Sequence, residues 1–102
     1  MKYTRKHLWL DSSPAKTDIG ITQKGDELMG GITFVEVLKD SIAVESNKSA
    51  EELPNESAGA FVPYPVEYPL DFSKPVAYLP EGVVWKGELM DEDEYRKYCE
   101  TL

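Results

Sequence analysis

The alternation of apolar and polar residues along the chain predicts a protein built mainly of β-strands. Short stretches rich in β-branched and aromatic residues occur at 3–9, 18–21, 32–37, 42–46 and 83–89, and each has the length of an ordinary strand. In the stretch 32–37 apolar residues occupy both alternating sets of positions, as in a strand that is largely buried on both faces. We expect the first stretch to be an edge strand that leads into a turn at 11–14.

End signals predict two short helices. The Thr22 hydroxyl can accept a hydrogen bond from a free backbone amide at a helix start, and Gly30 can end that helix in the left-handed conformation. Asp91, followed three residues later by Glu94, has the spacing of a capping box for a helix at the C-terminal end. Helical spacing places four residues on one face of this second helix: Tyr95, Tyr98, Cys99 and Leu102.

The segment 60–80 has an unusual composition. Five prolines alternate there with aromatic residues, and each proline removes a backbone donor that a central strand or a helix would need. We therefore expect an extended surface loop with strand fragments. A polyproline ligand for a signalling module is disfavoured because the segment contains no Pro-x-x-Pro spacing.

Size and charge narrow the class of protein. With 102 residues the chain is expected to form a single domain over 1–102. A formal charge of -8 repels phosphate groups, so we expect neither nucleic acid nor a membrane surface as a partner. No apolar run reaches the length of about 18 residues that a membrane span needs, and the first residues lack a signal or transit pattern. A cytoplasmic location is the resulting expectation.

The chain has one cysteine, Cys99, and one histidine, His7. This count excludes an internal disulfide and leaves too few soft or imidazole ligands for a structural zinc site. A catalytic Cys–His pair gains no support, because the two residues lie at opposite ends of the sequence. Ordinary roles are expected instead, with Cys99 as a small apolar residue on the terminal helix and His7 as a partly buried polar ring.

Several motifs match one family in order and spacing. They are Ile-Gly-Ile-Thr-Gln-Lys-Gly-Asp-Glu-Leu-Met-Gly-Gly-Ile-Thr-Phe-Val at 19–35, Glu-Ser-Asn-Lys-Ser at 45–49, Tyr-Thr-x-x-His-x-Trp at 3–9, and Glu-Gly-Val-Val-Trp followed by Leu-Met-Asp-Glu-Asp-Glu-Tyr at 81–95. Together these segments resemble the H protein of the glycine cleavage system, in a shortened and divergent form. Leu8 stands where that family usually has Glu, and we expect it on a surface that the family keeps polar.

The resemblance implies a fold that is mainly β. It is a small lipoyl-carrier-like sandwich of two short sheets, also called a barrel-sandwich hybrid, with a short helix after Thr22 and a C-terminal helix. We expect the two sheets to enclose a core that contains Phe34, Val35, Val44 and Trp85.

The resemblance also implies a carrier function without a catalytic centre. In the family the segment that here is Glu45, Ser46, Asn47, Lys48 and Ser49 carries lipoate as a covalent group on its lysine, so Lys48 is the expected attachment residue. A lysine at the tip of a turn suits this role because an enzyme must enclose its flexible four-carbon stem. The implied partners are glycine decarboxylase (P protein), aminomethyltransferase (T protein), dihydrolipoyl dehydrogenase (L protein), and a lipoate ligase or lipoyl transferase.

The chain also departs from the family pattern, which leaves alternatives open. The segment 38–43 is shorter than in the family, and the turn that follows the lysine there is matched only loosely by residues 54–59. A paralogue without lipoate, acting as a protein-interaction module through residues 61–80, is therefore the main alternative, with Lys48 as an ordinary solvated lysine. A stand-alone enzyme ranks third because nothing pairs the carboxylates with a nucleophile or a set of metal ligands.

Overall fold

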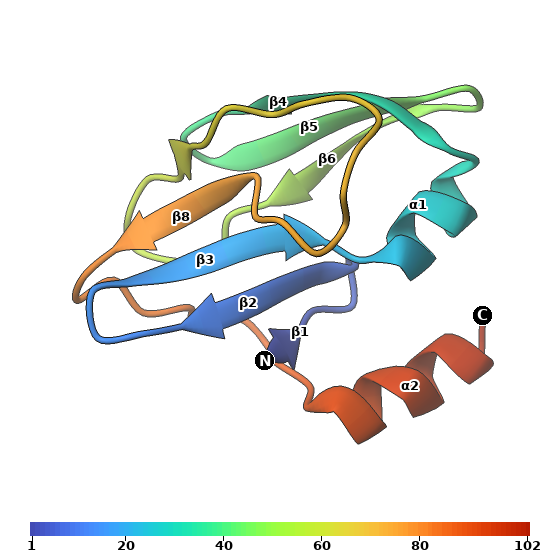
Figure 1. Ribbon diagram of the computed structural model, residues 1–102. Helices are drawn as coiled ribbons and strands as arrows, with labels where there is room; N and C mark the ends of the chain where they lie inside the picture. Colours follow the sequence, from blue (N-terminus) through green and yellow to red (C-terminus); the bar gives the residue numbers. More distant parts are fainter.

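Two antiparallel sheets lie face to face in the computed structural model, which describes all 102 residues (Figure 1). The five-stranded sheet has the order β1 (Lys2–Tyr3), β2 (Leu8–Ser12), β3 (Lys16–Ile21), β8 (Ala77–Pro80) and β7 (Val62–Pro63). The three-stranded sheet contains β4 (Ile32–Val37), β5 (Ser41–Ser46) and β6 (Ala50–Pro54). The expected sandwich of two short sheets is confirmed. Neither helix has the length and hydrophobicity of a membrane-spanning segment.

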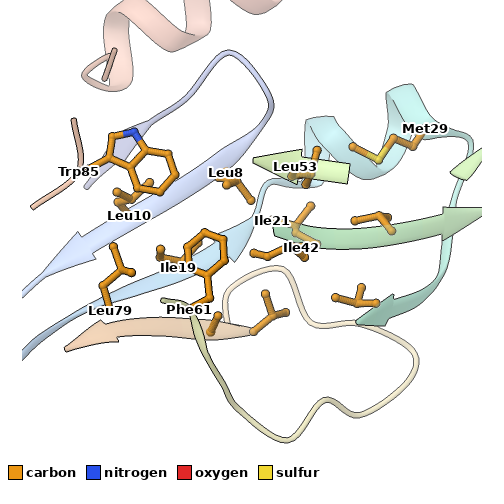
Figure 2. Close-up of a cluster of buried hydrophobic side chains, with 14 residues drawn as sticks. Leu8, Leu10, Ile19, Ile21, Met29, Ile42, Leu53, Phe61, Leu79 and Trp85 are labelled. Atoms are coloured by element: carbon orange, nitrogen blue, oxygen red, sulfur yellow. The ribbon is translucent and has the colours of Figure 1, made fainter. Parts of the chain in front are cut away.

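The core fills the space between the two sheets. Pairing of Leu8 with Ile21 and of Leu10 with Ile19 places four apolar side chains on the inner face of the larger sheet, because alternate residues of a strand share a face. The three-stranded sheet contributes Val35, Ile42, Val44 and Leu53 from the opposite side. Figure 2 shows Trp85 and Phe61 beside this cluster, so the core positions predicted for Val35, Val44 and Trp85 are confirmed.

Helix α1 (Gln23–Met29) connects the two sheets and has the predicted ends. The Thr22 hydroxyl accepts a hydrogen bond of 3.0 Å from the Gly25 amide. Gly30 ends the helix with a φ of 84°, and its amide donates to the carbonyls of Asp26 and Glu27. A residue with a side chain is strained at this φ, whereas glycine adopts it freely.

Helix α2 (Glu92–Glu100) has the predicted capping box. The Asp91 carboxylate accepts from the Glu94 amide at 2.8 Å, and the Glu94 carboxylate accepts from the Asp91 amide at 3.2 Å. Tyr95 is buried and Tyr98 and Cys99 are half-buried, but Leu102 lies beyond the helix and is exposed. The predicted apolar face is therefore shorter than helical spacing suggested.

The structure corrects the expected burial of β4. Phe34 is 47% exposed, and among the six residues of β4 only Val35 is buried. The prediction of a core position for Phe34, and of burial on both faces of 32–37, was wrong. Nothing but the Tyr68 ring, at a centroid distance of 6.4 Å, stacks on Phe34 on the outer side of the three-stranded sheet. Apolar composition alone does not distinguish a strand covered on both faces from one covered on a single face.

Two predicted strands also differ. Residues 83–89 form no strand, since only an isolated bridge between Ser57 and Trp85 occurs there, and the Lys86 amide donates to the Glu56 carbonyl in a loop. The stretch 3–9 is divided by a turn, in which His7 has a φ of 69° and its amide donates to the Thr4 carbonyl. Leu8 then begins β2 and is only 1% exposed. It lies in the core, so the expected polar surface at this position is wrong.

The Pro-rich segment is an extended loop with strand fragments, as predicted. The fragments β7 and β8 pair with each other, with Val62 opposite Tyr78. Most of the aromatic side chains are engaged within the fold: Phe61 is in the core, and Tyr64 donates to the Asp18 carboxylate at 2.7 Å. Tyr68 is exposed, although its hydroxyl accepts a hydrogen bond of 2.8 Å from the Val35 amide.

Candidate functional site

Lys48 lies at the tip of the hairpin formed by β5 and β6. The two strands pair up to Glu45 and Ala50, and the Ser46 amide donates to the Ser49 carbonyl at 2.9 Å, which leaves Asn47 and Lys48 as the loop residues. In Figure 1 this tip extends beyond the sheet at the end of the molecule where α1 lies. The second arm of the hairpin, which the sequence left uncertain, is therefore a paired strand in a definite register.

Ser46 holds the turn together. Its hydroxyl oxygen accepts hydrogen bonds from the amides of Lys48 at 3.2 Å and Ser49 at 3.1 Å, and the hydroxyl donates to the Ser49 carbonyl at 3.2 Å. A side chain that forms hydrogen bonds with the backbone groups of a turn favours that turn over other local conformations of the backbone. The serine of the predicted attachment motif thus has a structural role at this site.

The Lys48 side chain is exposed to solvent. Its ammonium group makes no hydrogen bond and no ion pair with any residue of the chain; the salt bridges involve Arg5, Lys16 and Arg96 instead. The stem of Lys48 lies across Gly30, where an added Cβ would be 2.7 Å from its Cδ. The amine is accessible, and the stem has a definite neighbour that the sequence did not reveal.

The other predicted motif residues surround the tip. Asn47 and Ser49 are exposed beside Lys48, and Glu45 is exposed on the outer side of the three-stranded sheet. Pairing places Glu45 opposite Phe34, and Glu36, Ala43 and Glu52 are aligned in neighbouring positions of the three strands. Glu36, Glu45 and Glu52 form no ion pair. The face next to the β5–β6 hairpin is therefore acidic, with Phe34 as its exposed aromatic residue.

A buried hydrogen-bond network holds the start of α1. The Tyr95 hydroxyl lies 2.7 Å from Nδ1 of His7 and 2.7 Å from Oγ1 of Thr22, so α2 contacts the residue that caps α1. Burial raises the pKa of Tyr95 strongly. Burial and the nearby Lys24 ammonium lower the pKa of His7, since both disfavour the positive charge of the protonated imidazole ring.

His7 and Cys99 lie near opposite ends of the sequence, but the fold brings these two parts of the chain together. His7 and Cys99 both lie beside Tyr95, and the Cys99 side chain is one of the neighbours that raise the pKa of that tyrosine, after burial. The His7 Nδ1 atom is engaged with Tyr95, however, and no hydrogen bond joins His7 to Cys99. Helical spacing predicted the inward position of Tyr95, but the sequence contains no signal for its two polar partners. No group of three or more His, Cys, Asp and Glu residues is arranged to hold a metal ion.

Comparison with known proteins agrees with this architecture. No protein-family model matches the chain, and no curated protein sequence does. Among solved structures, the chain is similar to the crystal structure of a glycine cleavage system H protein from Mycobacterium marinum, with a TM-score of 0.72 and 22% identity. The superposition covers 99% of this chain and 96% of that chain. The two proteins share a fold over essentially their full lengths.

Proposed function

We propose that residues 1–102 form one carrier domain that bears a lipoyl group on Lys48 and shuttles aminomethyl groups and reducing equivalents in glycine cleavage. The supporting observation is the geometry of Lys48: an unpaired amine at the tip of a hydrogen-bonded hairpin turn, in a fold shared with an H protein. The domain has no catalytic centre of its own in this proposal. Its partners are the P, T and L proteins and a lipoate ligase or lipoyl transferase.

The residues at the tip fit a covalent lipoyl group. Acylation forms an amide between Nζ and the lipoyl carboxyl carbon, breaks the bond from that carbon to the phosphate oxygen of lipoyl-adenylate so that AMP leaves, and removes two protons from the ammonium. Because Nζ makes no ion pair, acylation breaks no salt bridge when the positive charge disappears. The glycine at position 30 also leaves room for the stem, where a Cβ would collide with it. When attached, the lipoyl group supplies a disulfide that accepts the aminomethyl group and is later regenerated by oxidation.

The residues around Lys48 have separate tasks in this proposal. Ser46 keeps the turn closed through its three hydrogen bonds, so that the lysine is presented in one position. Glu45 is exposed and unpaired on the same strand, which makes it available to a basic group of the modifying enzyme. The acidic outer face can steer basic partner surfaces toward the tip and favours brief encounters.

Intact-mass measurement after co-expression with a lipoate ligase and supply of lipoate tests the proposal. We expect the wild-type protein to gain one lipoyl group and the Lys48→Ala variant to gain none. Lys39→Ala is the matched control, because Lys39 is an exposed lysine near the turn between β4 and β5 of the same sheet. That variant should be modified like the wild type. An unmodified wild-type protein, or equal modification of Lys48→Ala, would reject the proposal.

A carrier-type fold without lipoate, used as an interaction module, is the second candidate. The stacked and exposed pair Phe34 and Tyr68 favours it, as does a surface hollow of about 370 Å³ lined by residues of the Pro-rich loop such as Val66 and Leu70. Exposed apolar groups of this kind often mark contact surfaces. The mass of Lys48-containing peptides from the protein in its own cells distinguishes the two candidates, since the module requires an unmodified lysine.

A further inference from the structure

Gly30 and Lys48 are far apart in sequence but in contact in the fold. A Cβ built on Gly30 would lie 2.9 Å from Cγ, 2.7 Å from Cδ and 3.1 Å from Cε of Lys48. Distances under about 3 Å are shorter than the carbon contacts found in packed proteins, which are optimal near 3.5 to 4.0 Å. The aliphatic stem therefore lies directly on the Gly30 backbone, and only a residue without a side chain permits this position.

The charge of the lysine also suits this place. Helix α1 has an acidic residue in its first turn and no basic residue in its last turn. Gly30 is the C-terminal cap of that helix, so the ammonium bonded to Cε lies beside the negative end of the helix dipole. Lys48 thus supplies the positive charge that the helix sequence itself lacks at this end.

We propose that the Gly30 backbone is the docking position of the unmodified Lys48 side chain in the free protein, and that this contact slows the acylation of Lys48. A modifying enzyme must enclose the lysine stem, and the carbons that it encloses are those that lie on Gly30. The stem therefore has to leave Gly30 before the reaction, and the contact stabilises only the free carrier. The contact itself stands on the geometry alone, whereas its effect on acylation rests on the proposed lipoyl-carrier function.

The chain contains a matched control for the substitution Gly30→Ala. Gly82 has the same φ of 84° as Gly30, but a Cβ added there meets no atom within 4 Å. Gly31 has a φ of 94°, and the nearest atom to its added Cβ is Nδ2 of Asn47 at 3.8 Å. Gly82→Ala and Gly31→Ala therefore introduce similar backbone strain without touching the Lys48 stem.

Nuclear Overhauser effects measure the contact without any modifying enzyme. We expect cross-peaks between the Lys48 side-chain methylenes and the Gly30 α-protons in the wild-type protein. Gly30→Ala should displace the stem and shift the Lys48 methylene signals toward those of a free lysine, while Gly82→Ala should leave both unchanged. Absence of the cross-peaks in the folded wild-type protein would refute the contact between Lys48 and Gly30. Persistence of the cross-peaks in the Gly30→Ala variant, with unshifted methylene signals, would refute it as well.

Steady-state acylation by a lipoate ligase measures the effect on the reaction. Loss of a contact worth about one buried methylene, about 0.8 kcal/mol, corresponds to about a fourfold change. We expect Gly30→Ala to raise kcat/KM about fourfold through a lower KM with kcat unchanged, relative to Gly82→Ala. Equal constants for the two variants would refute the effect on acylation. If no variant is acylated, the proposed function fails and the effect fails with it, while the cross-peaks still decide the contact.

Discussion

Replacing Tyr95 by Phe removes one hydroxyl and little else. The ring stacks on Tyr3 at a centroid distance of 4.5 Å, and this contact is retained in Phe. The hydroxyl, however, joins Nδ1 of His7 and Oγ1 of Thr22, each at 2.7 Å, inside a site where Tyr95 is only 8% exposed. Thr22 keeps a second partner, the Gly25 amide, but His7 loses its only side-chain hydrogen bond.

The magnitude follows from these two bonds. A buried hydrogen bond contributes about 1 kcal/mol, and a buried group left without a partner adds a desolvation penalty of about 1 kcal/mol or more. We therefore expect Tyr95→Phe to lower the free energy of unfolding by about 2 to 3 kcal/mol. For a domain of about 100 residues this corresponds to a fall in Tm of roughly 10 °C.

Urea unfolding followed by tryptophan fluorescence, with Tyr98→Phe as the control, checks this expectation. Tyr98 lies on the same helix and donates from an exposed hydroxyl to the Arg5 carbonyl at 3.3 Å, so its loss should change the unfolding free energy by less than about 0.5 kcal/mol. If the unfolding free energy of both variants falls by the same small amount, the buried network does not attach α2 to the rest of the domain and the reasoning is refuted.

Three further predictions concern His7, Leu8 and Ser46. Burial, followed by the nearby Lys24 ammonium, lowers the pKa of His7 below 6.5, so the unfolded chain binds more protons and stability should fall as the pH drops below that value. Tm should therefore decrease between about pH 7.5 and about pH 5.5, a range above the usual pKa values of carboxylates. The decrease should be smaller in the His7→Asn variant. Leu8→Glu should lower the free energy of unfolding by about 4 kcal/mol or more, since it places a carboxylate in the core; a soluble variant with unchanged Tm would contradict this. Ser46→Ala should remove about 1 kcal/mol of turn stability and speed amide exchange at Ser49, and unchanged exchange would show that the turn holds without the hydroxyl.

The sequence predicted the parts of the fold that depend on neighbouring residues. The Thr22 cap, the left-handed Gly30 and the Asp91–Glu94 capping box all use contacts within a few positions, and each is present. The Lys48 turn belongs to the same class, because a polar tip between two β-forming stretches is a local signal. Such features are readable from one chain because the groups that determine them lie within one turn.

The failures concern contacts between distant segments. Phe34 has a strand pattern that fits either side of a sheet, and its exposure depends on whether another layer covers β4. Residues 83–89 have β-forming side chains, but their backbone follows Glu56 and Ser57 rather than a sheet edge. The Gly30 contact with Lys48 likewise depends on how the β5–β6 hairpin lies over the end of α1. The spacing of residues along the chain does not predict any of these contacts.

A short series of contacts connects Lys48 to the C-terminal helix. The Tyr95 hydroxyl of α2 forms a hydrogen bond with the Thr22 hydroxyl, Thr22 caps the first turn of α1, and α1 ends at Gly30, which contacts the Lys48 stem. A helix of seven residues is too short to be stable by itself, so its placement relies on these end contacts. The C-terminal helix, although remote from Lys48 in sequence, is therefore connected to the Gly30 surface beside the lysine, and the β5–β6 hairpin is not independent of the two helices.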